Sequence, residues 1–194
     1  ISPVGLAKLP ANQFEIDNEA AAPQGILVRS ADMHDAPLPD SLLAIARAGA
    51  GTNNIPVEDC TNKGIVVFNT PGANANAVKE LVLAGMLLAS RDIIGGVAWV
   101  RDNADDENVG KAAEKAKKQF AGGEILGKTL GVIGLGAIGK LVAQSAEALG
   151  MKVIGYDTFL SKEQMAELGV EKYDDKFEAL KAADVVIVQM PLIE

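Results

Sequence analysis

The chain has very little cysteine, histidine and aromatic content. Its 194 residues include one cysteine, one histidine and only 4% aromatic residues. Because Cys60 has no second cysteine to pair with, an internal disulfide is excluded, and such usage is typical of a reducing cytosol. Cys60 also lacks the companion Cys and His residues that a zinc site requires. The sequence therefore predicts a cytoplasmic protein without a bound metal.

Positive charge and long apolar runs are scarce as well. The 18 Lys and Arg against 26 Asp and Glu give a net charge of −8, which argues against a nucleic-acid partner. The N-terminus shows no signal-peptide pattern, and no apolar run has the length of a membrane span. The most apolar stretch, residues 81–94, is interrupted by Arg91 and Asp92, and we expect it to be a buried helix. Neither nucleic acid nor a membrane is therefore an expected partner.

What the chain does contain is a strand, turn, helix and second strand between residues 128 and 157. The β-branched apolar run Thr129–Ile133 is typical of a buried strand, and a helical pattern of apolar residues runs from there to Gly150. Lys152–Tyr156 is expected to form the next strand, and Asp157 follows it at its tip. Between the first strand and the helix stand three glycines with the spacing G-x-G-x-x-G, namely Gly134, Gly136 and Gly139.

Each of these residue types has a physical role in binding a dinucleotide. Gly134 permits a tight turn, Gly136 lets the backbone approach a pyrophosphate, and Gly139 lets helix and strand pack closely. The N-terminus of the helix offers N–H groups and a positive dipole end to the diphosphate. Asp157 can accept hydrogen bonds from the ribose hydroxyls, and no Lys or Arg directly follows it, which favours NAD over NADP. A tight βαβ turn without a ligand is the alternative, and the full context favours dinucleotide binding.

The first part of the chain predicts a smaller α/β lobe. Gly25–Arg29 and residues 65–68 are expected strands, and residues 39–48 and 77–94 are expected helices. Arg29 and Ser30 follow the first strand at its carboxyl end, where ligand groups gather in open α/β sheets. Arg29 either pairs with an anionic substrate group or forms a salt bridge with Asp32 or Asp35, and its position alone does not decide between these.

Later segments complete the division into two lobes. The Gly95-Gly96 pair is expected to be a hinge, which divides the chain into lobes 1–95 and 96–194. The acidic run 102–107 lacks the spacing of a calcium loop and indicates a solvated loop before a helix at residues 109–120. Residues 184–189 are expected to form a buried parallel strand. A sheet that ended on that strand would expose an edge, so we expect the 194 residues to be a fragment of a longer enzyme.

The motifs RSAD, RAGAGTNN, VVFNTPGANA, KTLGVIGLGAIG, GYD and DVVIVQMPL occur in this order along the chain. This ordered set resembles the D-2-hydroxyacid dehydrogenase family, and most of all its 3-phosphoglycerate dehydrogenase branch. The resemblance implies an α/β fold in which a Rossmann-type doubly wound parallel sheet is preceded by a smaller flavodoxin-like substrate lobe, both incomplete here. It also implies NAD as cofactor and hydride transfer between a small anionic 2-hydroxy acid and its 2-oxo acid.

The resemblance implies roles for further residues. On the cofactor side, Ala137 and Ile138 would face the pyrophosphate through their backbone, Ala50 would lie near the nicotinamide, and Met190 and Pro191 would flank the groove. On the substrate side are Arg29, Ser30, Gly49 and Asn74. Gln189 is a departure, because the family usually has a histidine at that position.

The family's catalytic Arg, Glu and His come from segments that would follow residue 194. The only histidine, His34, lies in a polar turn and is expected to be exposed, so no residue here is assigned a catalytic role. We therefore expect this chain alone to bind cofactor without turnover, and the complete enzyme to be a homo-oligomer. A non-enzymatic NAD(H)-sensing protein, as in corepressors that resemble this family, is the alternative function. Glyoxylate, lactate and formate dehydrogenases remain open among the enzymes.

Overall fold

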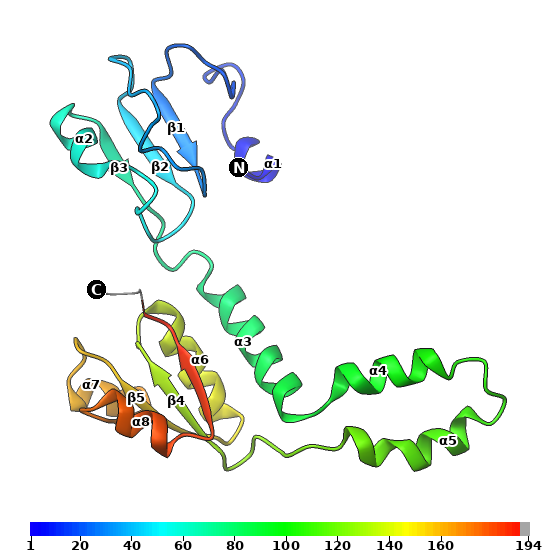
Figure 1. Cartoon of the computed structure of the whole chain (residues 1–194). Helices are drawn as coiled ribbons and strands as arrows, with labels where there is room; N and C mark the ends of the chain where they lie inside the picture. The colour runs from blue at the N-terminus through cyan, green and yellow to red at the C-terminus, as the bar shows by residue number, and fades with distance from the viewer. Residues whose placement is uncertain (191–194) are drawn as a thin grey trace. The chain divides into compact units, whose positions relative to one another are not determined.

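The computed structural model describes residues 1–190, and the chain forms two compact units, Ile1–Asn74 and Ala75–Glu194 (Figure 1). The first unit has the elements α1 (Pro3–Leu6), β1 (Gly25–Val28), β2 (Ala44–Arg47), α2 (Val57–Asn62) and β3 (Val66–Phe68). Its three strands are parallel and follow the order β1-β2-β3. Its core is formed by Val28, Met33, Leu42, Ile45, Ile55, Cys60 and Ile65.

The helix expected at residues 39–48 is wrong, because part of this segment is strand β2. The run LLAIARA has the Ala and Leu content of a helix, but Ala44–Arg47 pairs in parallel register with both β1 and β3. Ile45 is fully buried at the centre of this sheet, and Leu42 packs in the same core. Tertiary pairing therefore overrides local helix propensity here. Because this segment is a strand, Arg47 lies at its carboxyl end, next to the candidate site.

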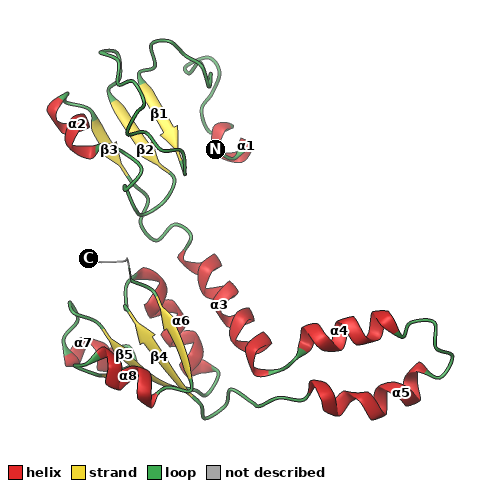
Figure 2. Cartoon of the chain, viewed as in Figure 1, coloured by secondary structure: helices red, strands yellow, loops and turns green. Residues whose placement is uncertain are grey.

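The second unit contains the sheet expected from the glycine motif. Its elements include β4 (Thr129–Ile133), α6 (Ala137–Ala148), β5 (Lys152–Tyr156), α7 (Lys162–Glu167), β6 (Glu171–Lys172), α8 (Lys176–Ala182) and β7 (Val185–Val188). All four strands are parallel in the order β6-β5-β4-β7, the first half of a doubly wound sheet. Ile133 pairs with Tyr156 on one side and with Val188 on the other, so these three strands end at one edge (Figure 2).

The parallel pairing of β7 agrees with the expectation, but its burial does not. Val186 and Val188 are 40% and 62% exposed, because β7 lies at the edge of the described sheet and has β4 as its one neighbour there. The core of the unit lies instead around β4, with side chains from β4, α6 and β5. Buried apolar side chains in this core include Leu130, Val132, Leu135, Val142, Ala146, Val153 and Met165.

Helix α3 (Ala75–Ser90) packs one face against α6, and Met86 is part of the core of the second unit. The buried helix expected at residues 81–94 is wrong in two respects. It ends at Ser90, and Leu81 is 74% exposed. Because α3 packs with α6, it is part of the second compact unit, which begins at Ala75. The lobe boundary at residue 95 stays a prediction. Within residues 1–190, no single helix is both long and apolar enough to cross a membrane; α3 and α4 would pass only as a pair bent by 68°.

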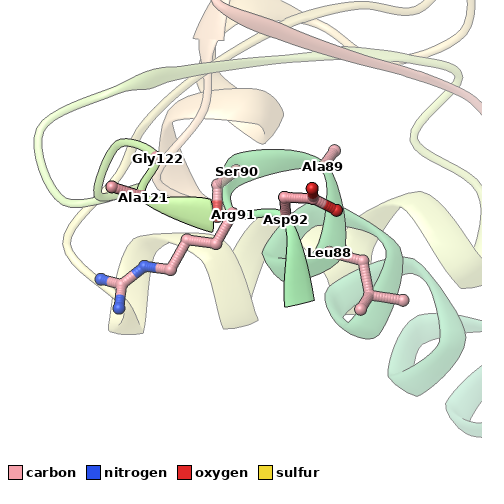
Figure 3. A pocket seen from close by; sticks show the side chains of 7 residues that line it. All are labelled: Leu88, Ala89, Ser90, Arg91, Asp92, Ala121 and Gly122. Atoms are coloured by element: carbon pink, nitrogen blue, oxygen red, sulfur yellow. The ribbon is translucent and has the colours of Figure 1, made fainter. Parts of the chain in front are cut away.

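A helical hairpin lies between α3 and β4 and consists of α4 (Ile93–Asp102), α5 (Val109–Ala116) and the 3-10 helix η1 (Lys117–Phe120). Trp99 of α4 meets Phe120 of η1, with their ring centroids 6.5 Å apart. The two ends of the hairpin are joined, because Gly123 N donates to the Ser90 carbonyl oxygen at 3.0 Å. Figure 3 shows Ser90 and the neighbouring Gly122 at this junction. The expected hinge at Gly95-Gly96 is wrong: both glycines lie inside α4, and Asp92 caps that helix by accepting from Gly95 N.

Candidate dinucleotide-binding site

The turn that follows β4 has two glycines that the fold itself requires. Gly134 has a φ of +93°, in the left-handed region that favours glycine, and a Cβ there would lie 2.9 Å from the Gln189 carbonyl oxygen. A Cβ at Gly139 would collide with the Gly134 carbonyl oxygen, because the first turn of α6 packs directly on the strand end. The fold alone therefore accounts for these two glycines.

Gly136 is different, because nothing in the fold requires it. Its φ of −69° lies outside the left-handed region that favours glycine. A Cβ built on Gly136 would have no heavy atom within 4 Å, so it would point into open space. A glycine without a conformational or packing reason leaves room for a group outside the chain. The open space at Gly136 would admit a phosphate group beside the first turn of α6.

The N-terminus of α6 supplies the hydrogen-bond donors for such a group. The first intrahelical bond is the one that Lys140 N donates to the Gly136 carbonyl oxygen at 3.1 Å. The N–H groups of Ala137, Ile138 and Gly139 precede it, and a helix provides no partner for these positions. They lie at the positive end of the dipole of a 12-residue helix. This set of donors suits a diphosphate without further basic side chains.

Asp157 stands at the tip of β5, beside the glycine turn. Its Oδ2 accepts from Leu135 N at 2.8 Å, and its Oδ1 accepts from Phe159 N at 2.8 Å and from Leu160 N at 3.1 Å. Partial burial raises the pKa of Asp157, but these three N–H groups, helped by the Lys140 charge, outweigh burial and hold the pKa below its ordinary value. The carboxylate is therefore ionised near neutral pH and can accept a hydroxyl donor.

The third strand end at this edge is that of β7. Gln189 N donates to the Ile133 carbonyl oxygen at 2.8 Å, which carries the β-ladder one residue beyond the strand. A Cβ at Gly134 would lie 3.1 Å from the Met190 Cβ, so Met190 borders the glycine turn. The other expected groove residue, Pro191, lies outside the described residues. Gly134, Gly136, Asp157 and Met190 are thus brought to one edge of one sheet.

The candidate substrate residues lie in the first unit, around the loop after β2. Ala48 N donates to the Val28 carbonyl oxygen at 2.8 Å, and Arg47 Nε donates to the Arg29 carbonyl oxygen at 3.1 Å. From the other side, Thr70 N donates to the Gly49 carbonyl oxygen at 2.9 Å, and Asn69 Nδ2 donates to the Ala50 carbonyl oxygen at 2.7 Å. These bonds bring the segment that carries Gly49 and Ala50 next to the end of β1, where Arg29 and Ser30 follow.

Two expected residues stay apart from this group. Asn74 is the last residue of the first unit and forms no hydrogen bond to these loops within the part of the chain that is described. His34 lies in an exposed turn, as expected, with its Nδ1 2.6 Å from the Asp32 Oδ1. Among residues 1–190, no group of three or more His, Cys, Asp or Glu side chains could hold a metal ion.

Sequence reasoning did not single out Arg47, which the structure places beside the candidate substrate residues Arg29 and Gly49. Its register partner is Val28 of β1, so Arg47 and Arg29 emerge from the carboxyl ends of neighbouring parallel strands. The Arg47 guanidinium also lies over the next loop, since a Cβ at Gly49 would be 2.6 Å from its Nη1. The motif RAGAG begins with this arginine. The sequence predicts a helix at residues 39–48, however, and an arginine at the end of a helix is not expected to be a ligand group.

Comparison with known proteins assigns the second unit. The model of the family described as "D-isomer specific 2-hydroxyacid dehydrogenase, NAD binding domain" matches residues 83–194. The chain belongs to this family. The resemblance expected from the sequence is thereby confirmed, as are the Rossmann-type α/β fold and the NAD-binding character of the domain.

Several D-2-hydroxyacid dehydrogenases are similar to the chain. A D-3-phosphoglycerate dehydrogenase of Methanocaldococcus jannaschii is 44% identical over 153 residues, 79% of this chain and 27% of that protein. Another, of Archaeoglobus fulgidus, is 39% identical over 188 residues, which are 95% of this chain and 33% of the relative. The chain thus spans about a third of the length of such relatives.

Solved structures of the family share the fold. An NAD⁺-bound 3-phosphoglycerate dehydrogenase of Entamoeba histolytica matches with a TM-score of 0.61 at 30% identity, over 88% of this chain and 47% of that one. The D-mandelate dehydrogenase of Rhodotorula graminis matches with a TM-score of 0.67 at 30% identity, over 81% and 45% of the two chains. Family members with different substrates therefore share this scaffold.

Proposed function

We propose that the complete protein oxidises 3-phosphoglycerate to 3-phosphohydroxypyruvate with NAD, a step of serine synthesis. The observation that carries the cofactor part is Gly136, a glycine that the fold does not need and that faces open space beside α6. Relatives named D-3-phosphoglycerate dehydrogenase at up to 44% identity support the substrate part. The broader class, oxidation of a 2-hydroxy acid, follows from the family.

The cofactor would be held by the edge of the sheet in the second unit. The N–H groups of Ala137 and Ile138 would bind the pyrophosphate, and Asp157 would accept hydrogen bonds from the ribose hydroxyls. Gly134 and Gly139 would shape the turn, and Met190 and Pro191 would border it. Ala50 stays a cofactor residue that the family resemblance implies. When bound, NAD supplies a hydride acceptor for the carbon that bears the substrate hydroxyl.

The substrate side has two cations on neighbouring strands. Arg29 is exposed at the end of β1, and Arg47 is partly buried at the end of β2. A guanidinium binds a carboxylate or a phosphate in a fork geometry. A substrate with both groups, such as 3-phosphoglycerate, can occupy two arginines, whereas D-lactate has one anionic group. Ser30 and Gly49 would line the same side and donate through hydroxyl and backbone groups, and Asn74 stays a substrate residue that the family resemblance implies.

Substrate assays on the complete protein test this proposal. NAD reduction is measured with 3-phosphoglycerate, D-lactate, glycerate and formate, and the reverse reaction with glyoxylate. We expect 3-phosphoglycerate to have the highest kcat/KM, and Arg47→Leu to reduce it while leaving NADH affinity unchanged. A preference for D-lactate would contradict the phosphate assignment. NADH binding without oxidation of any of these acids would support the NAD(H)-sensing alternative.

We also propose that the complete protein is a homo-oligomer, as the family resemblance implies. In support, α4 exposes several apolar side chains, since Ile94 is 68% and Val100 is 54% exposed. Apolar area of this kind is stabilised when a second copy covers it. Sedimentation velocity of the complete protein over a range of concentrations tests this, and a single monomeric species throughout would contradict it.

A further inference from the structure

The glycine turn is fastened to the tip of β5 at two successive backbone groups. Gly134 N donates to the Tyr156 carbonyl oxygen at 2.9 Å, and Leu135 N donates to Asp157 Oδ2 at 2.8 Å. The first bond continues the β4–β5 ladder, in which Ile133 pairs with Tyr156. The second bond is of another kind, because it uses a side chain. The direction of the Leu135 N–H, and with it the path into Gly136, is therefore set by the Asp157 carboxylate.

The carboxylate is itself held in place by its own turn. Its second oxygen accepts from Phe159 N and Leu160 N, which fixes the side chain from the far side. Both oxygens are thus engaged with backbone N–H groups of the chain itself. A residue whose only task was to meet ribose hydroxyls would not need to contact the phosphate turn.

We propose that Asp157 is a positioning residue for the glycine turn in addition to a ribose ligand, and that it holds the turn in the conformation that receives the diphosphate. This inference rests on the proposed NAD site. Donation of the Leu135 N–H to Asp157 directs that group away from the ligand and leaves the N–H groups of Gly136 and the first turn of α6 for the phosphates. Loss of the carboxylate would then weaken the binding of any diphosphate ligand, whether or not it carries ribose hydroxyls.

For a ligand without ribose hydroxyls, the expected change in affinity on loss of the carboxylate is opposite to the change that a ribose-only role predicts. A carboxylate is a negative charge near an anionic ligand, so its removal by itself favours diphosphate binding. For a ligand without ribose hydroxyls, a ribose-only Asp157 therefore predicts unchanged or tighter binding in Asp157→Ala. A positioning Asp157 predicts weaker binding, because the turn must be ordered when the ligand binds.

The experiment compares ADP with 2′,3′-dideoxyadenosine diphosphate, which lacks both hydroxyls, by calorimetric titration of the 194-residue chain. NADH is titrated as the reference ligand. Asp157→Ala is expected to weaken binding of the dideoxy ligand roughly tenfold, the worth of one charge-assisted hydrogen bond. Asp157→Asn keeps one acceptor oxygen and is expected to lose less. Asp175→Ala is the matched control, because Asp175 also accepts two backbone N–H groups but does so at the start of α8, and it should change affinity by less than about twofold.

A ligand-free measurement keeps the inference testable in every case. Amide hydrogen exchange at Leu135 is followed by NMR in the folded chain, whose integrity is checked by circular dichroism. We expect the Leu135 amide to exchange faster in Asp157→Ala and to be unchanged in Asp175→Ala. Equal exchange at Leu135 in the wild type and Asp157→Ala overturns the inference, as does full retention of dideoxy-ligand binding. If the wild type binds neither ADP nor NADH, the proposed function fails instead, and the exchange result still decides the role of Asp157.

Discussion

At the scale of single residues, Gly136 is where the needs of the fold and those of a ligand separate. Since its Cβ position is open, Gly136→Val is expected to leave the free energy of unfolding close to that of the wild type. The added side chain occupies the space of the pyrophosphate, so NADH binding should be lost. Urea denaturation and NADH fluorescence titration measure the two effects. Normal NADH binding by this variant would place the phosphates elsewhere.

Gly139 provides the opposite control for that experiment. A Cβ at this position collides with the Gly134 carbonyl oxygen, and backbone cannot move aside cheaply. Gly139→Ala should therefore destabilise the chain by about 1–3 kcal/mol, the range for overpacked sites. A chain in which Gly136→Val is the more destabilising of the two would contradict this division between structural and functional glycines.

We expect Asp157 to determine the choice between the two nicotinamide cofactors as well. A 2′-phosphate beside this ionised carboxylate would meet a like charge, and the residues that follow, Thr158 and Phe159, carry no positive charge. NADH is therefore expected to bind much more tightly than NADPH in parallel titrations. Asp157→Ala should bring the affinities for NADH and NADPH closer together. The main cause would be weaker NADH binding, by about 1.5–3 kcal/mol for each lost hydrogen bond. Equal affinities in the wild type would refute the assignment.

At the scale of elements, the hairpin of α4, α5 and η1 depends on a crossing of its two ends. A Cβ at Gly122 would collide with the Ser90 carbonyl oxygen, whereas a Cβ at Gly123 has no heavy atom within 4 Å (Figure 3). Gly122→Ala is therefore expected to cost about 1–3 kcal/mol of stability. Gly123→Ala should cost little and is the matched control. Urea denaturation of both variants measures the difference, and equal stabilities would mean that the crossing yields easily.

Elements of the second unit also give the chain an acid sensitivity. Donation from Thr129 N lowers the pKa of Asp184 below its ordinary value of 3.8, against the opposing effect of burial and with help from Lys128. A carboxyl whose pKa is lowered by folding stabilises the fold above its unfolded pKa, and this contribution is lost as the pH falls through the folded value. Asp184→Asn should therefore flatten the loss of stability below about pH 3.8. Denaturation curves at a series of pH values check this, and an unchanged slope would contradict it.

The sequence predicted the elements well wherever local signals and tertiary pairing agree. Strands β4 and β5 match their expected bounds, and the helix between them ends before Gly150, which has a left-handed φ of +80°. Ser161 forms a full capping box with Gln164 at the start of α7. Segment 39–48 failed because its Ala and Leu residues favour a helix, while pairing with two strands decides its structure. Such pairing is not visible in a local window.

The candidate site was predictable to a similar degree. Residues with a motif, such as Gly136 and Asp157, could be assigned from spacing alone. The contact between Asp157 and the Leu135 N–H could not, because a backbone donor leaves no mark in the sequence. Arg47 was not predicted to lie near the site, because the strand that ends at this residue was expected to be a helix. Exposure was also beyond reach: α3 has an apolar sequence, but the described residues cover only one of its faces.

At the scale of the whole molecule, the described chain combines a glycine turn suited to phosphate with a single histidine, which lies in an exposed turn. Oxidation of a 2-hydroxy acid leaves a hydroxyl proton that a base within hydrogen-bond reach must accept. The single histidine of the chain is about half exposed and pairs with Asp32 through its Nδ1. The His34 backbone N–H, and after it the imidazole, lower the pKa of Asp32 by their hydrogen bonds to its carboxylate. The imidazole lies in a surface turn.

The 194-residue chain should therefore bind NADH but not reduce NAD with 3-phosphoglycerate or D-lactate. Loss of a general base alone typically lowers the rate by about 10²–10⁴-fold. The measurement is NADH formation by absorbance at saturating substrate, with NADH titration of the same sample as proof of a folded site. Gly136→Val serves as the control for cofactor-dependent signal. If the wild-type chain reduced NAD and His34→Ala did not, the surface turn would supply the general base. The functional roles assigned here to the two units would then be wrong.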